Sequence, residues 1–190
     1  MDNHILSIEE KQTLLKLARV AIKRKANNLS SLKIELADYP ANLQKIHATF
    51  VTITKKGLLR GCIGTLEAYQ SLVEDVYEHA VAAAFEDFRF PPVQLKEVNQ
   101  LKIEVSVLSE PEVLDFNDPI EIVDKIRVGI DGVVINDGVR RATFLPQVWE
   151  KVPDPEDFLS QLCYKMGAAP DCWRSNNLRI SVYQVDEFSD

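Results

Sequence analysis

The sequence predicts an α+β fold with a mostly antiparallel sheet and flanking helices. Helix and strand signals are interspersed without the regular strand–helix–strand repeat of a parallel sheet. Short apolar strands separated by glycine-containing turns indicate antiparallel pairs. The 190 residues, 46% of them hydrophobic and 27% charged, can bury one sizeable core or two small ones packed together.

Three helices are predicted from their N-terminal signals. Ser-x-x-Glu capping boxes begin at Ser7 and Ser71, and each precedes apolar residues at helical spacing, over 8–22 and 72–84. A third helix follows Asp154, where Asp-Pro-x-Asp combines a capping side chain with a proline at the first helical position. Each of these helices is expected to pack an apolar face against the sheet.

β-Branched and alternating segments predict the strands. Residues 48–64, ATFVTITKKGLLRGCIG, form a hairpin whose turn contains KKG. Residues 101–108 alternate apolar and polar side chains, and residues 126–146 form a meander in which two Asp-Gly turns separate short strands. A final strand is expected over 178–185, and residues 115–119 are a candidate connection between two subdomains.

Charge and composition narrow the functional classes. The net charge is −7, from 22 Lys and Arg against 29 Asp and Glu, so the protein should repel nucleic acid. No apolar run is long enough for a membrane span, and MDNHILSIEEKQ does not resemble a signal peptide, so we expect a cytoplasmic protein that does not bind membranes. An odd number of cysteines without a CxxC pair favours free thiols in a reducing compartment: Cys62, Cys163 and Cys172. We expect Cys163 and Cys172 to be packing residues, and no metal site, because these cysteines and His4, His47 and His79 lack metal-ligand spacing.

The segment LLRGCIGTL contains the main candidate site. On a regular strand Arg60 and Cys62 would point to the same face, where the arginine would favour a thiolate if the site is sheltered. Gly61 and Gly64 would let a ligand or another backbone approach closely. A cysteine between aliphatic residues is more often a buried packing residue than a nucleophile, and both interpretations stay open.

Other polar side chains are weaker candidates. Glu104 lies on the polar face of its strand. It is expected to be exposed to solvent, and the alternative is that it acts as a general base. Asp87 and Arg89 are expected to form a solvated ion pair. Alternatively, the loop that carries them presents Arg89 to bind an anion. Arg141 begins a meander strand, and His79 is expected on the surface of its helix.

Several segments together resemble the AMMECR domain family. They are LLRGCIGTL, AAAFEDFRFPPV, LKIEVSVLSEPE, VGIDGVVI, RRATFLPQVWEKVPDPEDFL and KMGAAPDCW, and the similarity runs from about Leu14 to Phe188. The family signature falls on Leu59, Arg60, Gly61, Cys62, Ile63, Gly64, Thr65, Asp87, Arg89, Phe90, Pro91, Pro92, Arg140, Arg141, Leu145, Pro146 and Gln147. The sequence departs from the family at Phe88, where proline is usual, and at Ala142, where glycine is common. The resemblance implies one domain over residues 1–190, built of two unequal, closely packed subdomains with LRGCIG near the cleft between them.

The resemblance also suggests a functional context. Family members are often encoded beside a Memo-type protein and a radical S-adenosylmethionine enzyme, which implies an accessory or partner-binding role in a redox or modification pathway. The residues expected to bind a partner or an unspecified small molecule are Arg60, Gly61, Gly64, Thr65, Arg89 and Arg141. The alternative is an enzyme with Cys62 as nucleophile or redox thiol and Glu104 as base. A nucleic-acid regulatory role ranks third, and the residues point to no particular cofactor or oligomeric state.

Overall fold

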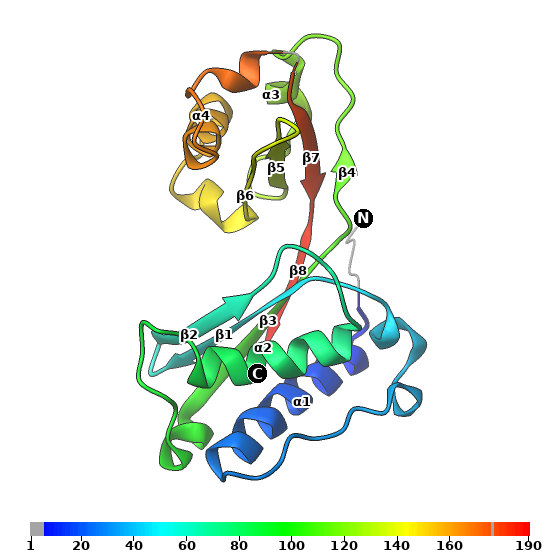
Figure 1. Cartoon of the computed structure of the whole chain (residues 1–190), viewed down its shortest axis with the longest axis vertical. Helices are drawn as coiled ribbons and strands as arrows, with labels where there is room; N and C mark the ends of the chain where they lie inside the picture. The colour runs from blue at the N-terminus through cyan, green and yellow to red at the C-terminus, as the bar shows by residue number, and fades with distance from the viewer. Residues whose placement is uncertain (1–5, 176) are drawn as a thin grey trace. The chain divides into compact units, whose positions relative to one another are not determined.

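Two hydrophobic cores divide the chain into two units in the computed structural model, which describes residues 6–175 and 177–190 (Figure 1). The first unit comprises residues up to Leu108 together with Asp186–Asp190, and the second is Ser109–Val185. The sheets are antiparallel and carry flanking helices, so the predicted α+β class is confirmed. The connection predicted at 115–119 is wrong, because these residues lie inside the second unit.

The first unit places two helices on one face of a four-stranded sheet of order β2-β1-β3-β8. Both predicted capping boxes are present, at Ser7 and Ser71. Lys56 and Gly57 connect the hairpin strands with positive φ angles of 53° and 78°, as a tight hairpin turn requires. The elements are α1 (Ile8–Ala26), β1 (Thr49–Lys55), β2 (Leu58–Gly64), α2 (Leu72–Phe85), β3 (Leu101–Leu108) and β8 (Val185–Ser189).

The two faces of this sheet differ in burial. Val51 and Ile53 on β1 and Ile103 and Val105 on β3 are fully buried in the core beneath the helices. The residues between them, such as Thr52, point to the opposite side because strand side chains alternate. We call that side the outer face of the first sheet.

The second unit has its own sheet, of order β4-β7-β5-β6, packed against α4. Within its core the Trp149 and Phe158 rings stack with centroids 3.6 Å apart. Its elements are β4 (Glu112–Val113), α3 (Glu121–Lys125), β5 (Gly132–Asn136), β6 (Arg141–Phe144), α4 (Pro155–Lys165) and β7 (Arg179–Tyr183). Short 3₁₀ helices complete the chain at Leu36–Asp38, Ala41–Gln44, Leu95–Gln100, Pro146–Glu150 and Cys172–Arg174.

Two strand predictions need correction. The first Asp-Gly pair does not join two strands: the Asp131 carboxylate accepts hydrogen bonds from the backbone and side chain of Arg127, and this closes a turn before β5. The predicted final strand is divided at Gln184, and its two parts, β7 and β8, belong to different sheets.

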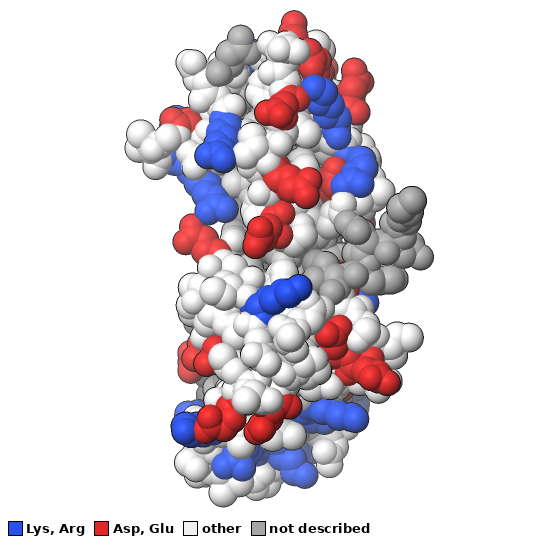
Figure 2. Space-filling view, turned by 90° about the vertical axis from the view of Figure 1, so that its right-hand side faces the viewer, with Lys and Arg blue, Asp and Glu red and all other residues white. Residues whose placement is uncertain are grey.

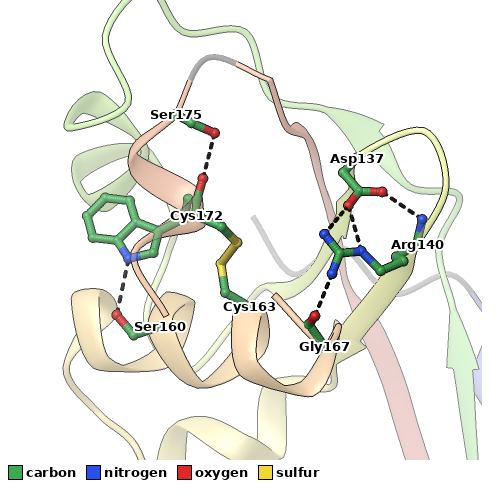
Figure 3. The surroundings of a disulfide bond; sticks show 8 residues. Asp137, Arg140, Ser160, Cys163, Gly167, Cys172 and Ser175 are labelled. Carbon is green, nitrogen blue, oxygen red and sulfur yellow. Dashed lines mark hydrogen bonds and ion pairs between the residues drawn. A yellow bond between two sulfur atoms is a disulfide. The ribbon is translucent and has the colours of Figure 1, made fainter. Parts of the chain in front are cut away.

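The expectation of three free thiols is also wrong. Cys163 near the end of α4 and Cys172 form a disulfide (Figure 3). The chain reverses direction between them at Gly167, whose φ of 78° suits glycine, and this brings the two sulfurs together. Trp173 follows Cys172, and its indole donates a hydrogen bond to the Ser160 hydroxyl over 3.2 Å. Cys62 is the remaining free cysteine.

The surface in view carries mixed charge. On the face shown in Figure 2, Lys and Arg side chains are interspersed with Asp and Glu. Within the described part of the chain, no helix combines the length and apolar character needed to cross a membrane.

Candidate functional site

Cys62 lies on β2, an edge strand of the first sheet. The register places Cys62 opposite Thr52 of β1, and Thr52 opposite Glu104 of β3. We call these three residues the thiol row. The Thr52 hydroxyl donates to the Cys62 sulfur over 3.3 Å, and Cys62 is half-buried. The row lies on the outer face, so the sulfur is not part of the core.

A β-bulge decides which way Cys62 points. The register between β1 and β2 shifts by one residue between Ile53 and Thr54, and Arg60 is the extra residue. With an unshifted register Cys62 would lie opposite Val51, whose side chain is fully buried. A shift of one residue exchanges the two faces of a strand. The bulge therefore places Cys62 on the outer face.

Arg60 contacts Glu97. The guanidinium donates to one Glu97 oxygen over 2.7 Å, and Lys55 donates to the other over 2.7 Å. Burial would raise the pKa of Glu97, but hydrogen bonds from Lys55, from the Gln94 backbone and from Arg60 outweigh it and lower that pKa. The expectation that Arg60 and Cys62 share a strand face is wrong, because the bulge interrupts the alternation. The Nη1 atom of Arg60 is buried and has no hydrogen-bond partner among the described residues.

Asp87 and Arg89 hold the free edge of β2 at Cys62. The Cys62 amide donates to Asp87 Oδ2 over 2.9 Å, and Arg89 Nη2 donates to the Cys62 carbonyl over 3.3 Å. Arg89 also grips both Asp87 oxygens, at 2.9 and 2.7 Å. We call this pair the Asp87–Arg89 clamp. Asp87 is buried, with 4% of its surface exposed, so the expected solvated ion pair is wrong.

The clamp has a marked electrostatic signature. Hydrogen bonds from the Arg89 side chain, and then from the backbone amides of Cys62 and Arg89, hold the pKa of Asp87 far below its usual range despite its burial. The pKa of Arg89 is raised, first by these bonds to Asp87 and to a smaller extent by the charge of Asp87.

The two glycines of the motif face backbone atoms of the same chain. A Cβ on Gly61 would lie 1.9 Å from the carbonyl oxygen of Ala83 in α2. A Cβ on Gly64 would lie 2.3 Å from the Thr49 carbonyl oxygen and 2.4 Å from the Phe50 ring. Both glycines therefore serve close packing within the first unit, the second of the two roles open to them from the sequence.

Glu104 forms the far end of the thiol row. It is half-buried, and burial followed by the charge of Glu187 raises its pKa, against a smaller opposing effect of Lys102. A carboxyl group with a raised pKa is a better proton acceptor near neutral pH than an ordinary one. Glu104 is therefore the described group of this row best suited to proton transfer.

Thr65 follows β2 and adjoins a buried polar trio. Its amide donates to the Thr49 carbonyl over 3.0 Å, and its hydroxyl exchanges hydrogen bonds with the Glu67 backbone. The Thr49 hydroxyl donates to Asp75 Oδ2 over 2.6 Å, and His79 Nδ1 lies 3.1 Å from both oxygens. His79 is only 7% exposed, so its predicted surface position is wrong.

The other candidates lie elsewhere. Arg141 belongs to the second unit, where it is exposed at the start of β6 opposite Asn136. His47 Nδ1 lies 3.3 Å from the Leu108 carbonyl oxygen. His4 is outside the described residues. Within residues 6–175 and 177–190, no three His, Cys, Asp or Glu side chains are grouped to hold a metal ion.

Residues 15–188 match the sequence model of AMMECR1. The chain belongs to the AMMECR1 family. A protein of Methanothermobacter thermautotrophicus is 40% identical over 184 residues, which cover 96% of this chain and 95% of the relative. Protein MJ0810 of Methanocaldococcus jannaschii is 36% identical over 189 residues, covering 98% and 92%. The crystal structure of the uncharacterized protein PH0010 from Pyrococcus horikoshii aligns with a TM-score of 0.83 at 34% identity, covering 98% of this chain and 94% of that one.

Two segments of this AMMECR1 chain that are distant in sequence meet at Cys62. Residues 59–65 supply the strand, and residues 87–92 supply the clamp on its edge. Asp87 is 25 positions from Cys62, so no local pattern could reveal the contact. The alternation of β1 does indicate that Thr52 shares a face with Thr54, but its pairing with Cys62 depends on the bulge.

Proposed function

We propose that this AMMECR1 protein is an accessory binding component that presents the surface around Cys62 to a partner protein. Following the family resemblance, the partner is a Memo-type protein acting with a radical S-adenosylmethionine enzyme in a cytoplasmic redox or modification pathway. Thr65 and Arg89 border this surface, whereas Arg60 is turned towards Glu97. A small molecule bound at this surface is the second form of the same role.

The observation that carries this proposal is that the charged groups around Cys62 are engaged with one another. Arg60 forms an ion pair with Glu97, and Arg89 forms an ion pair with Asp87. Asp87 contacts the Cys62 backbone, but its strongly lowered pKa makes it a weak proton acceptor. Such an arrangement supports a rigidly held surface more than an activated nucleophile.

An exposed aromatic residue lies within the clamp. Phe88 is 96% exposed, although the residues on both sides of it are held by Cys62. Leu58 and Leu59 of the same strand as Cys62 are 74% and 43% exposed. Aromatic side chains on fixed backbone are typical anchors of protein interfaces, because little conformational entropy is lost when they are buried.

Capture of a purified Memo-type protein from the same organism tests the proposal. Phe88→Ala should weaken capture by at least tenfold, the effect of removing an interface anchor. Val139→Ala is the matched control, since Val139 is 94% exposed in the second unit, and it should change capture less than twofold. Cys62→Ser should also have little effect. Equal capture by the Phe88 and Val139 variants, or no capture by the wild type, would contradict the proposal.

A thiol-dependent enzyme is the second candidate, favoured by the thiol row. The Thr52 hydroxyl donates to the sulfur, as a bond to a thiolate requires, and Glu104 has a raised pKa. In this role the thiol proton passes to Glu104 through water while the sulfur displaces a leaving group from an electrophilic carbon of the substrate, and the leaving group takes the proton from Glu104 as it departs. Iodoacetamide labelling at pH 7 distinguishes the two roles: a tenfold loss of rate in both Thr52→Ala and Glu104→Gln supports the enzyme, and unchanged rates support the binding component.

A further inference from the structure

The second unit contains a basic pocket that the role of Cys62 does not use. It has a volume of about 270 Å³ and lies on the face of the second sheet opposite the core. Val133 and Ile135 of β5 point into the core, whereas Val134 and Asn136 line the pocket. The side-chain alternation of the strands thus separates a dry face from a ligand-accessible one.

Two arginines flank an amide at one end of this pocket. The register places Asn136 opposite Arg141 of β6 and also opposite Arg179 of β7. Because neighbouring strands lie about 4.8 Å apart, the two arginines start roughly 10 Å from each other, on either side of the amide. Both arginine side chains line the pocket, and no lining residue is acidic in the described part of the chain. This combination stands out in a protein whose net charge is −7.

The next row of the sheet supplies a hydroxyl and an apolar floor. Val134 lies opposite Ser181, and Ser181 lies opposite Val113. The pocket therefore offers two guanidinium groups, an amide and a hydroxyl beside aliphatic side chains. Guanidinium groups bind phosphate and carboxylate oxygens through charge-assisted hydrogen bonds, and two positive charges match the charge of a dianion.

We propose that this pocket binds a small phosphate monoester, with Arg141 and Arg179 on the phosphate group and Val113 and Val134 under the organic part. A phosphate monoester near neutral pH carries close to two negative charges and three terminal oxygens, enough to engage both arginines and Asn136. A monocarboxylate carries half the charge and two oxygens. The ligand class is thus a phosphorylated metabolite of modest size, and the site does not depend on the role of Cys62.

Calorimetric titration with phenyl phosphate, inorganic phosphate and benzoate tests this assignment. Phenyl phosphate should bind saturably, and about tenfold more tightly than either inorganic phosphate, which lacks the apolar part, or benzoate, which lacks the second charge. Arg141→Gln and Arg179→Gln should each weaken its binding at least tenfold. Arg140→Gln removes the same charge one residue away, outside the pocket lining, and should change binding less than twofold.

Amide chemical-shift mapping of the wild type keeps the test independent of the variants. Shifts centred on Asn136 and Ser181 support the site, and shifts centred elsewhere overturn it. Absence of saturable phenyl phosphate binding, equal binding of benzoate, or an equal loss in Arg140→Gln also overturns it. Cys62→Ser should bind phenyl phosphate like the wild type, so failure here leaves the proposal on Cys62 standing.

Discussion

Replacing Gly61 by alanine tests how tightly β2 packs on α2. The added Cβ would lie 1.9 Å from the Ala83 carbonyl oxygen and 2.9 Å from its carbonyl carbon. Carbon and oxygen in close contact are roughly 3.3 Å apart, so strand and helix must separate by about 1.4 Å. Overpacking of a core typically costs about 1–3 kcal/mol, and we expect the upper end, about 3 kcal/mol, because both elements must shift as backbone.

Urea denaturation followed by far-UV circular dichroism measures this loss directly. In thermal unfolding it corresponds to a Tm lower by about 6–12 °C for a chain of this size. Adding Ala83→Gly should not restore stability, since the obstructing atom belongs to the backbone.

Gly57→Ala is the matched control. It has open space around the added methyl group but a φ of +78°, so its cost, about 1 kcal/mol, comes from the left-handed backbone alone. If Gly61→Ala were no more destabilising than Gly57→Ala, the packing described for Cys62 and its strand would be refuted.

Three further predictions concern stability. Reducing the disulfide between Cys163 and Cys172, which closes a loop of sequence separation 9, should lower the free energy of unfolding by about 2.6 kcal/mol; an unchanged urea midpoint in reductant would contradict the link. The lowered pKa of Asp87 means that its carboxylate stabilises the fold above about pH 5 and loses this effect as the pH falls through the acid range. Asp87→Asn should therefore cost about 2 kcal/mol at pH 7 and flatten the decline of stability between about pH 5 and 3, and a decline as steep as that of the wild type would count against it. The raised pKa of Glu104 affects stability in the opposite direction, because the charged carboxylate is disfavoured in the folded state. Glu104→Gln should therefore raise the free energy of unfolding at pH 7 by less than about 0.5 kcal/mol. A loss of stability measured in urea would show that Glu104 has a stabilising partner.

Local signals predicted the elements that depend on a few neighbouring residues. The capping boxes at Ser7 and Ser71 and the helix start at Asp154 rely on contacts three residues apart, and all three are present. The turn at Lys56 and Gly57 is similarly local. The Asp-Gly pair at Asp131 misled the prediction because its carboxylate binds Arg127 and closes a different turn.

The surroundings of Cys62 were beyond the reach of such signals. Glu97 is 37 residues from Arg60, and Asp87 is 25 residues from Cys62. These pairs therefore exist only once the 3₁₀ helix Leu95–Gln100 and the segment after α2 have packed beside β2. The disulfide is a similar case, since its cysteines lack a recognisable spacing and meet through the turn at Gly167.

The α+β class and most helices and strands could be predicted from the amino-acid sequence, because they follow from periodicity and from contacts within a few residues. The family followed from the resemblance of several segments in order. The orientation of Cys62, in contrast, depends on contacts between segments that are distant along the chain. A single bulge at Arg60 exchanges the two faces of β2, and the energy of that choice comes from packing against α2 and from distant charges. The same holds for the basic pocket, where Arg141 and Arg179, 38 positions apart, become neighbours of one asparagine through strand pairing alone.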